Sequence, residues 1–247
     1  MFIRSLIAAA AAGLCLAGAA AAEPTPVVVR AIAKDAKFIG DSMGGVAITL
    51  SDAKTGKVLA EGVTSGGTGD TERLIVKPRV RREPISTPDA AGFAATLDID
   101  KPTLVQARAS GPLGKPDAKI TVTSQMWLLP GRAVEGDGWI LEMPGLVIEP
   151  QWTSAGSAAT LTAKVTLMCG CPITPGGHWD AARYDVEATL SRDGTSLPAA
   201  KLDYAGSPST FDAAFHDLTP GRYLLTLTAH DAGSGNSGVV QREVVVE

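Results

Sequence analysis

The chain has 247 residues, with 22 basic and 26 acidic side chains and a formal net charge of −4. This balance excludes a protein that binds nucleic acid through a concentrated basic surface, because neutralising phosphates requires many clustered cations. Hydrophobic residues make up 45% of the chain, which excludes a largely disordered protein. The length is sufficient for one large domain or two ordinary ones.

The first 22 residues have the order of a secretory signal peptide. Arg4 precedes an apolar stretch at 6–16, and three alanines at 20–22 end the segment. The apolar stretch is shorter than the roughly 20 residues that a membrane helix requires. We therefore expect cleavage after Ala22 and a mature chain that is periplasmic or secreted, with no transmembrane segment. In that oxidising compartment the mature chain carries two cysteines, Cys169 and Cys171.

Alternation of apolar and polar residues predicts β-strands along the whole mature chain. At 161–167, four apolar side chains alternate with Thr162, Lys164 and Thr166, which places the apolar set on one face of a sheet. The same pattern recurs at 46–50, 93–99, 105–109, 184–190, 211–215 and 223–229. Turns rich in Gly and Pro separate these segments, and none has a sustained helical period. The sequence thus predicts an all-β protein of about fourteen strands in antiparallel β-sandwiches.

A glycine-rich stretch interrupts the strand pattern near the middle of the chain. Gly131, Gly136 and Gly138 lie there, with Glu135 and Asp137 between them. The chain on either side has the length of one sandwich. We therefore predict a first sandwich at 23–132, a linker at 133–138 and a second sandwich at 139–247.

Four short motifs follow one another in the first half of the mature chain. They are a strand at 45–50, Thr-Gly-Lys at 55–57, Gly-Val-Thr at 62–64 and Asp-Ala-Ala-Gly-Phe at 89–93. This order resembles the carboxypeptidase regulatory-like (transthyretin-like) β-sandwich family, with an insertion at 71–86. The resemblance implies a noncatalytic module used for binding, spacing or assembly.

The second half contains Leu-Thr-Pro-Gly-Arg-Tyr-Leu at 218–224, Ala-His-Asp at 229–231 and a closing apolar stretch at 239–246. These features resemble bacterial immunoglobulin-like modules. The resemblance places Tyr223 at a tyrosine corner, where its hydroxyl would bond to upstream backbone. It also implies a noncatalytic module, although a fold alone does not define a function.

The segment at 167–179 holds the residues best suited to chemistry, and it supports three hypotheses. The first is a disulfide between Cys169 and Cys171. Residues i and i+2 of an extended strand lie roughly 6.5 Å apart, whereas a disulfide brings its two Cβ atoms to about 3.8 Å. The bond therefore requires a local bend, which Gly170 can supply.

The second hypothesis is a site for a soft metal such as Cu(I), the one cofactor that the sequence suggests. Two thiolates bound to one metal require less bending than a disulfide, and thioether and imidazole groups also bind copper. The candidate ligands are Cys169, Cys171, His178 and Met168. Met168 points to the opposite face of a regular strand, so it joins the set only if a bulge at Gly170 turns the chain.

The third hypothesis is a pair of inert thiols in the core, because free cysteine packs like a small hydrophobic residue. Export into an oxidising compartment disfavours two persistently free thiols. The sequence alone leaves the three hypotheses open.

Tryptophan and methionine are concentrated in one part of the sequence. All four tryptophans and three of the five methionines fall between 126 and 179: Trp127, Trp139, Trp152, Trp179, Met126, Met143 and Met168. One interpretation is an exposed surface at the domain junction that meets a protein partner or Cu(I). The other is that these large side chains fill an interdomain contact.

The insertion at 71–86 contains a basic run with valines between the charges: Lys77, Arg79, Arg81 and Arg82, with Val76 and Val80. The run predicts either a site for an anionic partner or a charged edge that prevents aggregation.

Residues 40–44, Gly-Asp-Ser-Met-Gly, match the nucleophile elbow of α/β-hydrolases, which requires a strand before and a helix after it. Here a strand follows, so we predict no enzyme. The function predicted is that of an exported, noncatalytic binding or accessory protein that holds Cu(I) through its C-x-C plus His cluster. The alternative is a structural or protein-interaction module of the envelope or cell surface with a local Cys169–Cys171 disulfide.

Overall fold

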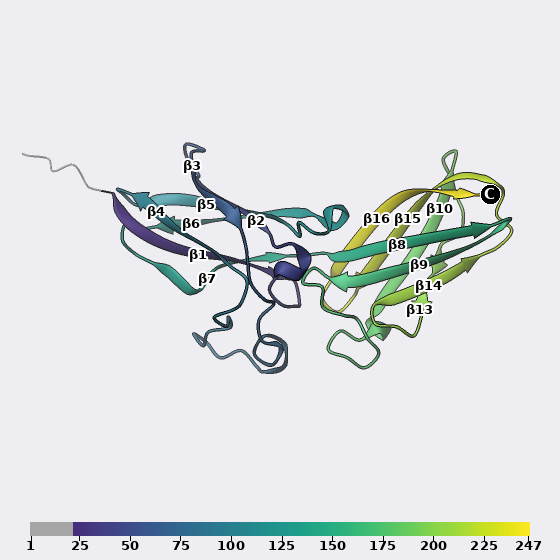
Figure 1. Cartoon of the computed structure of the whole chain (residues 1–247), viewed down its shortest axis with the longest axis horizontal. Coiled ribbons are helices and arrows are strands. Elements are labelled where there is room, and N and C mark those ends of the chain that lie inside the picture. The colour runs from purple at the N-terminus through teal and green to yellow at the C-terminus, as the bar shows by residue number, and fades with distance from the viewer. Residues whose placement is uncertain (1–21) are drawn as a thin grey trace, which may run out of the picture.

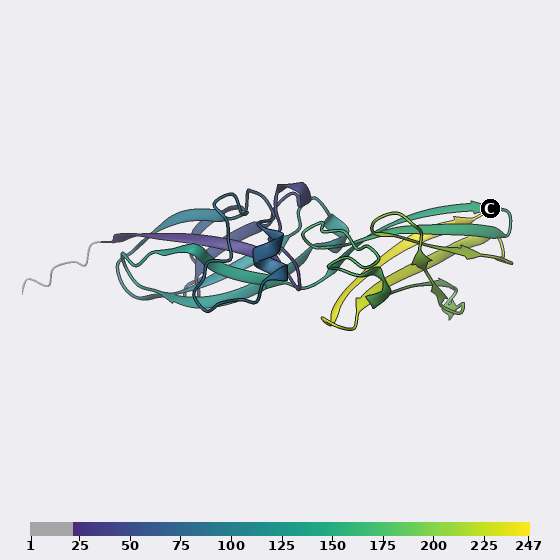
Figure 2. The ribbon, with the colours of Figure 1, turned by 90° about the horizontal axis from the view of Figure 1, so that it is seen from below.

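A computed structural model of the protein describes residues 22–247, and the predicted signal peptide lies outside this part except for Ala22. The described chain is all-β and forms two β-sandwiches arranged end to end (Figure 1). The view turned by 90° shows the same arrangement (Figure 2). No helix in this part of the chain is long and apolar enough to cross a membrane.

The first sandwich consists of a three-stranded and a four-stranded sheet. The three-stranded sheet has the order β4 (Phe93–Ile99), β1 (Glu23–Ala33), β7 (Val134–Met143). The four-stranded sheet has the order β3 (Val58–Val63), β2 (Ala47–Asp52), β5 (Thr103–Gly111), β6 (Ile120–Leu128). Three short helical turns lie between strands: η1 (Asp41–Met43), η2 (Glu72–Val76) and η3 (Pro116–Ala118).

The predicted linker at 133–138 is part of β7, not a connection between domains. Strand β7 pairs in parallel with β1 from Val27–Val134 to Ala33–Met143, and the register shifts between Val27 and Val29. The glycines that interrupt the sequence pattern form this bulge, because Gly136 and Gly138 have φ values of 70° and 69°. The chain instead passes to the second sandwich at 144–145.

The parallel pair also departs from the purely antiparallel sheets that the sequence predicts. Strands β1 and β7 both run toward the second sandwich (Figure 1), since β7 carries the chain there. All other strand pairs within the described residues are antiparallel.

The second sandwich also consists of two sheets. One sheet has the order β13 (Asp203–Tyr204), β14 (Thr210–Phe215), β9 (Ala158–Leu167), β8 (Leu146–Ala155). The other has the order β11 (Thr195–Ser196), β10 (Tyr184–Arg192), β15 (Gly221–Asp231), β16 (Asn236–Val246), with β12 (Ala200–Lys201) also pairing with β10. The turn η4 (Ala181–Arg183) precedes β10.

The period-two pattern predicts most of the side chains that enter the core, but Thr166, which it places outward, is buried as well. On β9, Leu161, Ala163 and Val165 are fully buried, whereas Lys164 is exposed. The predicted tyrosine corner is also confirmed, because the Tyr223 hydroxyl donates a hydrogen bond to the Thr219 carbonyl at 2.9 Å.

The insertion after β3 covers the outer face of the β4-β1-β7 sheet. Ile32 of β1, Phe38, Leu74 of η2, Ala90 and Ala91 form a small second core there. A further side chain from β1, Arg30, donates hydrogen bonds to the carbonyls of Ala90 and Ala91 and lies over the Phe38 ring. This packing explains why the insertion has a defined course despite having little regular structure.

Candidate functional site

The two mature cysteines form a disulfide in a tight turn just after β9. Their Cα atoms lie 5.4 Å apart, and Gly170 between them has a φ of 77°. The Gly170 amide donates to the Leu167 carbonyl at 2.8 Å, which closes the turn. The bend that the disulfide hypothesis requires is therefore present. Glycine suits this position, because a residue with a side chain would be strained at this φ.

This turn is buried between the two sandwiches. Cys169 and Cys171 are 2% and 6% exposed, and Met168 is fully buried. Met43 of η1, from the first sandwich, lies against the turn: a Cβ at Gly170 would come within 2.8 Å of its Sδ atom. Met168 lies against Gly145 in the connection between the sandwiches. The turn thus contacts both the other domain and the connecting segment.

His178 lies seven residues past Cys171, on an exposed loop. Its ring is edge-on to that of Trp179, with the centroids 6.1 Å apart. Trp179 is buried, and its indole N–H donates to the Asp35 carbonyl of the first sandwich at 2.9 Å. Within residues 22–247, no three His, Cys, Asp or Glu side chains gather as a metal site would require.

The tryptophans do not form one surface at the junction, so that interpretation of their clustering is wrong. Trp127 pairs with Leu104 near the free end of the first sandwich. Trp152 donates to the Val245 carbonyl near the carboxyl terminus, at the opposite end of the molecule (Figure 1). Trp179 does contact both sandwiches, but it does so as a buried residue. The tryptophans are close in sequence but far apart in space, because the segment 126–179 runs through both sandwiches.

A polar network locks the connection between the sandwiches. Asn236 is 1% exposed; its amide donates to the Gly145 carbonyl at 3.1 Å and accepts a hydrogen bond from the Gly145 amide. Both backbone groups of the connecting residue are thereby satisfied by one side chain from β16. These two hydrogen bonds hold Gly145 on the second sandwich, and we infer that they stiffen the connection.

Charged residues next to this connection are also engaged. Burial raises the pKa of Asp231, but hydrogen bonds from the Ser234 hydroxyl and the Gly233 amide, together with Arg183, outweigh burial and lower it. Burial and the charge of Asp231 raise the pKa of Asp35. The repulsion between Asp35 of the first sandwich and Asp231 of the second is partly offset by Arg183.

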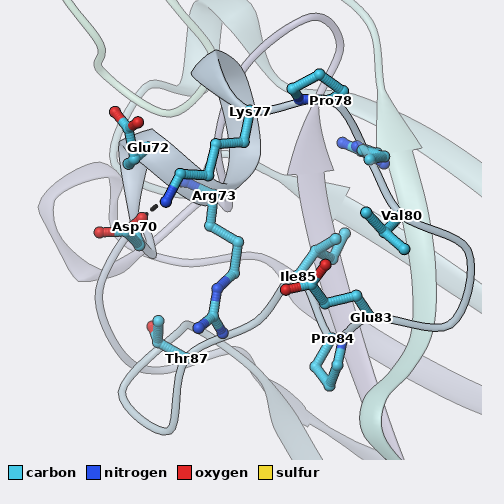
Figure 3. A pocket seen from close by; sticks show the side chains of 11 residues that line it. Asp70, Glu72, Arg73, Lys77, Pro78, Val80, Glu83, Pro84, Ile85 and Thr87 are labelled. Atoms are coloured by element: carbon cyan, nitrogen blue, oxygen red, sulfur yellow. Dashed lines mark hydrogen bonds between the residues drawn. The ribbon is translucent and has the colours of Figure 1, made fainter.

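A groove lies on the first sandwich, beside the insertion. It consists of two adjoining hollows of about 670 and 760 Å³ that share Lys77, Arg79 and Ile85. The first lies within the insertion (Figure 3). The second extends along β1 and β7 to the junction, where it includes Ser234 of the second sandwich. Its size and its position beside a domain interface are typical of ligand sites.

The base of the insertion is held firmly, while its tip is exposed. Asp137 of β7 accepts hydrogen bonds from the amides of Ile85 and Ser86 and from the Ser86 hydroxyl, at 2.7–3.0 Å. On the other side, Lys37 donates to the Gly69 carbonyl and the Thr71 hydroxyl. The groove therefore has a fixed frame below a solvent-exposed tip.

The lining of the groove combines apolar side chains with charges of both signs. Ile32, Ile75, Ile85 and Ile140 contribute apolar surface, and the tip adds Val80, which is 64% exposed. Four cations and five carboxylates lie along the groove: Lys34, Arg73, Lys77 and Arg79, with Asp35, Asp70, Glu72, Glu83 and Glu142. No ion pair within residues 22–247 includes Lys77 or Arg79.

Sequence reasoning identified the basic run but not the groove. The run was visible as charges at 77–82, whereas Asp137 and Ile140 lie more than fifty residues away. Only the pairing of β7 with β1 brings them beneath the insertion.

Ser42 of the hydrolase-like motif lies in η1, and β2 follows it. The motif therefore does not occupy the strand-to-helix turn of a nucleophile elbow.

Neither the models of known families nor the curated proteins match this chain. Three solved structures are reported as similar over 90% of it. They are a candidate carbohydrate binding protein from Bacteroides uniformis (9% identity, TM-score 0.29, all of that chain covered), a DUF3823 family protein from the same species (14%, 0.29, 99% covered) and the chicken interferon gamma receptor alpha chain (9%, 0.34, 97% covered).

Proposed function

We propose that this chain is an exported, noncatalytic accessory protein that binds an extended segment of a partner protein in the groove under the insertion. The observation that carries the proposal is a continuous groove with an apolar lining and charges of both signs. A polypeptide supplies the matching groups, because its own side chains include aliphatic, cationic and anionic types. The firm base at Asp137 reduces the ordering cost of binding.

The proposal includes export by the predicted signal peptide to the periplasm or the medium. We also propose that the first sandwich is a carboxypeptidase regulatory-like domain and that the second is a bacterial immunoglobulin-like domain. The proposed partner site is the groove and not a tryptophan surface, because Trp139, Trp152 and Trp179 are engaged in packing.

A phage-displayed random peptide library tests the proposal without knowledge of the partner. We expect the mature protein to select peptides that share an aliphatic residue flanked by charges. A Val80→Asp variant should lose these peptides, because it places a carboxylate on the apolar tip. Val239→Asp is the matched control, since Val239 is similarly exposed (59%) but lies on the second sandwich.

Selection of no peptides by the wild type would overturn the proposal. Equal binding by Val80→Asp would do so as well.

A second proposal, that the protein binds Cu(I), is supported by the sulfur atoms around the turn at Gly170. Met43 and Met168 lie beside Cys169 and Cys171, and a thioether–thiolate set suits Cu(I). Breaking the disulfide takes two electrons and two protons from an exported dithiol reductant and yields two thiols. These thiols, with Met168 and His178, would then hold the ion.

The test is an anaerobic titration of the reduced mature protein with Cu(I) against a competing chelator. We expect one equivalent to bind, and the Cys169→Ser/Cys171→Ser variant to bind none. His178→Ala should weaken binding if the exposed imidazole folds back. Absence of cysteine-dependent binding refutes the copper proposal and leaves the groove proposal unaffected.

A further inference from the structure

The outer face of the β3-β2-β5-β6 sheet lies on the opposite side of the first sandwich from the groove. Strands β5 and β6 are paired along their whole length, so side chains that are partners in register share a face. Three rows of partners face outward: Trp127 with Leu104, Gln125 with Gln106, and Thr123 with Arg108. The residues between them, such as Val105 and Ala107, point into the core.

Trp127 is the exception among the four tryptophans. It is 55% exposed, whereas Trp139 and Trp179 are at most 8% exposed. Tryptophan side chains are usually mostly buried, so a solvent-exposed indole on a regular strand is unusual. Its orientation is nevertheless defined, because it is held on β6 beside Leu104 and under a lysine.

Lys54 lies over the Trp127 ring, with its Nζ 5.6 Å from the ring centroid. The turn that carries Lys54 is itself fixed: the Asp52 carboxylate accepts hydrogen bonds from the amides of Lys54 and Thr55 at 2.8 and 2.9 Å. Lys54 thus covers one face of the indole in this conformation, and a ligand that stacks there displaces its exposed, flexible side chain.

Polar side chains continue from Trp127 along the two strands. Gln125 donates to Gln106 through its amide at 3.1 Å, which orients both amides and leaves a donor and an acceptor available. Arg108 follows on the next row and is exposed, as is Thr123. Successive rows are about 6.8 Å apart, so one extended ligand can contact several rows.

We propose that this outer face binds a linear polysaccharide, with one sugar ring stacked on Trp127 and the next rings hydrogen-bonded by Gln106, Gln125 and Arg108. The apolar C–H face of a pyranose matches an exposed indole, and its hydroxyl pairs match side-chain amides and guanidinium. A protein partner would instead favour a broad apolar core in its contact, which polar rows beside Trp127 do not provide.

Affinity electrophoresis in native gels tests the proposal. The probes are hydroxyethyl cellulose, mixed-linkage β-glucan and arabinoxylan as neutral chains, with polygalacturonate as the acidic chain. We expect at least one to retard the mature protein, and Trp127→Ala to weaken that binding about tenfold or more. Gln125→Ala should weaken it less. Leu224→Ala is the control, because Leu224 is an exposed apolar side chain (40%) on β15 of the second sandwich.

Retardation by neutral chains assigns the site to neutral glycans, and retardation by polygalacturonate alone assigns it to uronates through Lys54 and Arg108. No retardation by any probe overturns the proposal, as does retardation that Trp127→Ala leaves unchanged. Circular dichroism of each variant verifies that the sandwich is intact.

Discussion

The domain junction and the insertion groove differ in the exposure of their polar and reactive side chains. At the junction, Met168 and both cysteines are buried, and the Asn236 side chain forms hydrogen bonds with both the amide and the carbonyl of Gly145. At the groove, Lys77 and Arg79 carry charges without an ion pair in the described chain, and Val80 is exposed. The residues that look most reactive in the sequence are engaged in holding the molecule together, and a charged loop forms the available surface.

The largest expected effect is at the junction, from Met168→Ala. Met168 is fully buried, so truncation leaves a cavity and should lower the free energy of unfolding by about 2–5 kcal/mol. Urea denaturation followed by tryptophan fluorescence measures it. Val239→Ala, at an exposed site, should cost no more than about 0.5 kcal/mol. Equal losses in the two variants would show that the junction is not tightly packed.

The next effect in size is expected from Asn236→Ala. The variant leaves the amide and carbonyl of Gly145 without their partner, which should cost about 2 kcal/mol. Small-angle X-ray scattering should also show a broader distribution of interdomain distances. Ser237→Ala, at the exposed neighbouring position, is the control. An unchanged scattering profile would contradict the inference of a stiff connection.

Asp137→Asn should loosen the groove while leaving the junction intact. Burial alone would raise the pKa of Asp137. Hydrogen bonds from the Ser86 hydroxyl and from the amides of Ser86 and Ile85, together with the charge of Arg30, outweigh burial, so the pKa is lowered overall. The variant loses part of these interactions, at about 1–2 kcal/mol. Trypsin should then cleave faster in the basic run at 77–82, as measured by intact mass over time.

The same carboxylate makes the hold on the insertion depend on pH. Because the pKa is lowered in the folded state, its stabilisation is complete above the unfolded pKa of about 3.9 and is lost as the pH falls through the folded pKa. Hydrogen exchange at Ile85 and Ser86 should therefore quicken in acid relative to the trend of other amides. Asp137→Asn should lack this extra step, and its persistence in the variant would assign the step elsewhere.

The smallest effect on stability is expected from Lys77→Ala/Arg79→Ala. Both residues are exposed on the insertion tip, so unfolding should change by no more than about 0.5 kcal/mol. Binding of acidic peptides selected by the wild type should nevertheless fall and become less sensitive to salt. A loss of stability comparable to that of Met168→Ala would remove the contrast between the two regions.

Local patterns in the sequence were reliable wherever neighbouring residues decide the outcome. The alternation at 161–167 predicts β9 and its buried face, and the motif at 218–224 predicts the hydroxyl–backbone bond of Tyr223. The bend between the cysteines was likewise anticipated from Gly170. Each feature depends on backbone geometry within a few residues.

Patterns that depend on distant residues were misread. Glycines at 136 and 138 look like a linker, but they form a bulge because β1 supplies a parallel partner more than a hundred residues earlier. The tryptophans look like a cluster, but the strands carrying Trp127 and Trp152 end at opposite ends of the molecule.

By itself, the sequence determined the all-β class, the sandwich-sized halves and the inward face of the strands with an alternating pattern, because a period of two leaves little choice of face. Tertiary structure alone decided the domain boundary, the burial of the sulfur-rich turn against Met43 and the groove between the insertion and the β1–β7 pair. These features depend on contacts between segments that are remote in the chain, and no local periodicity encodes which remote segments meet.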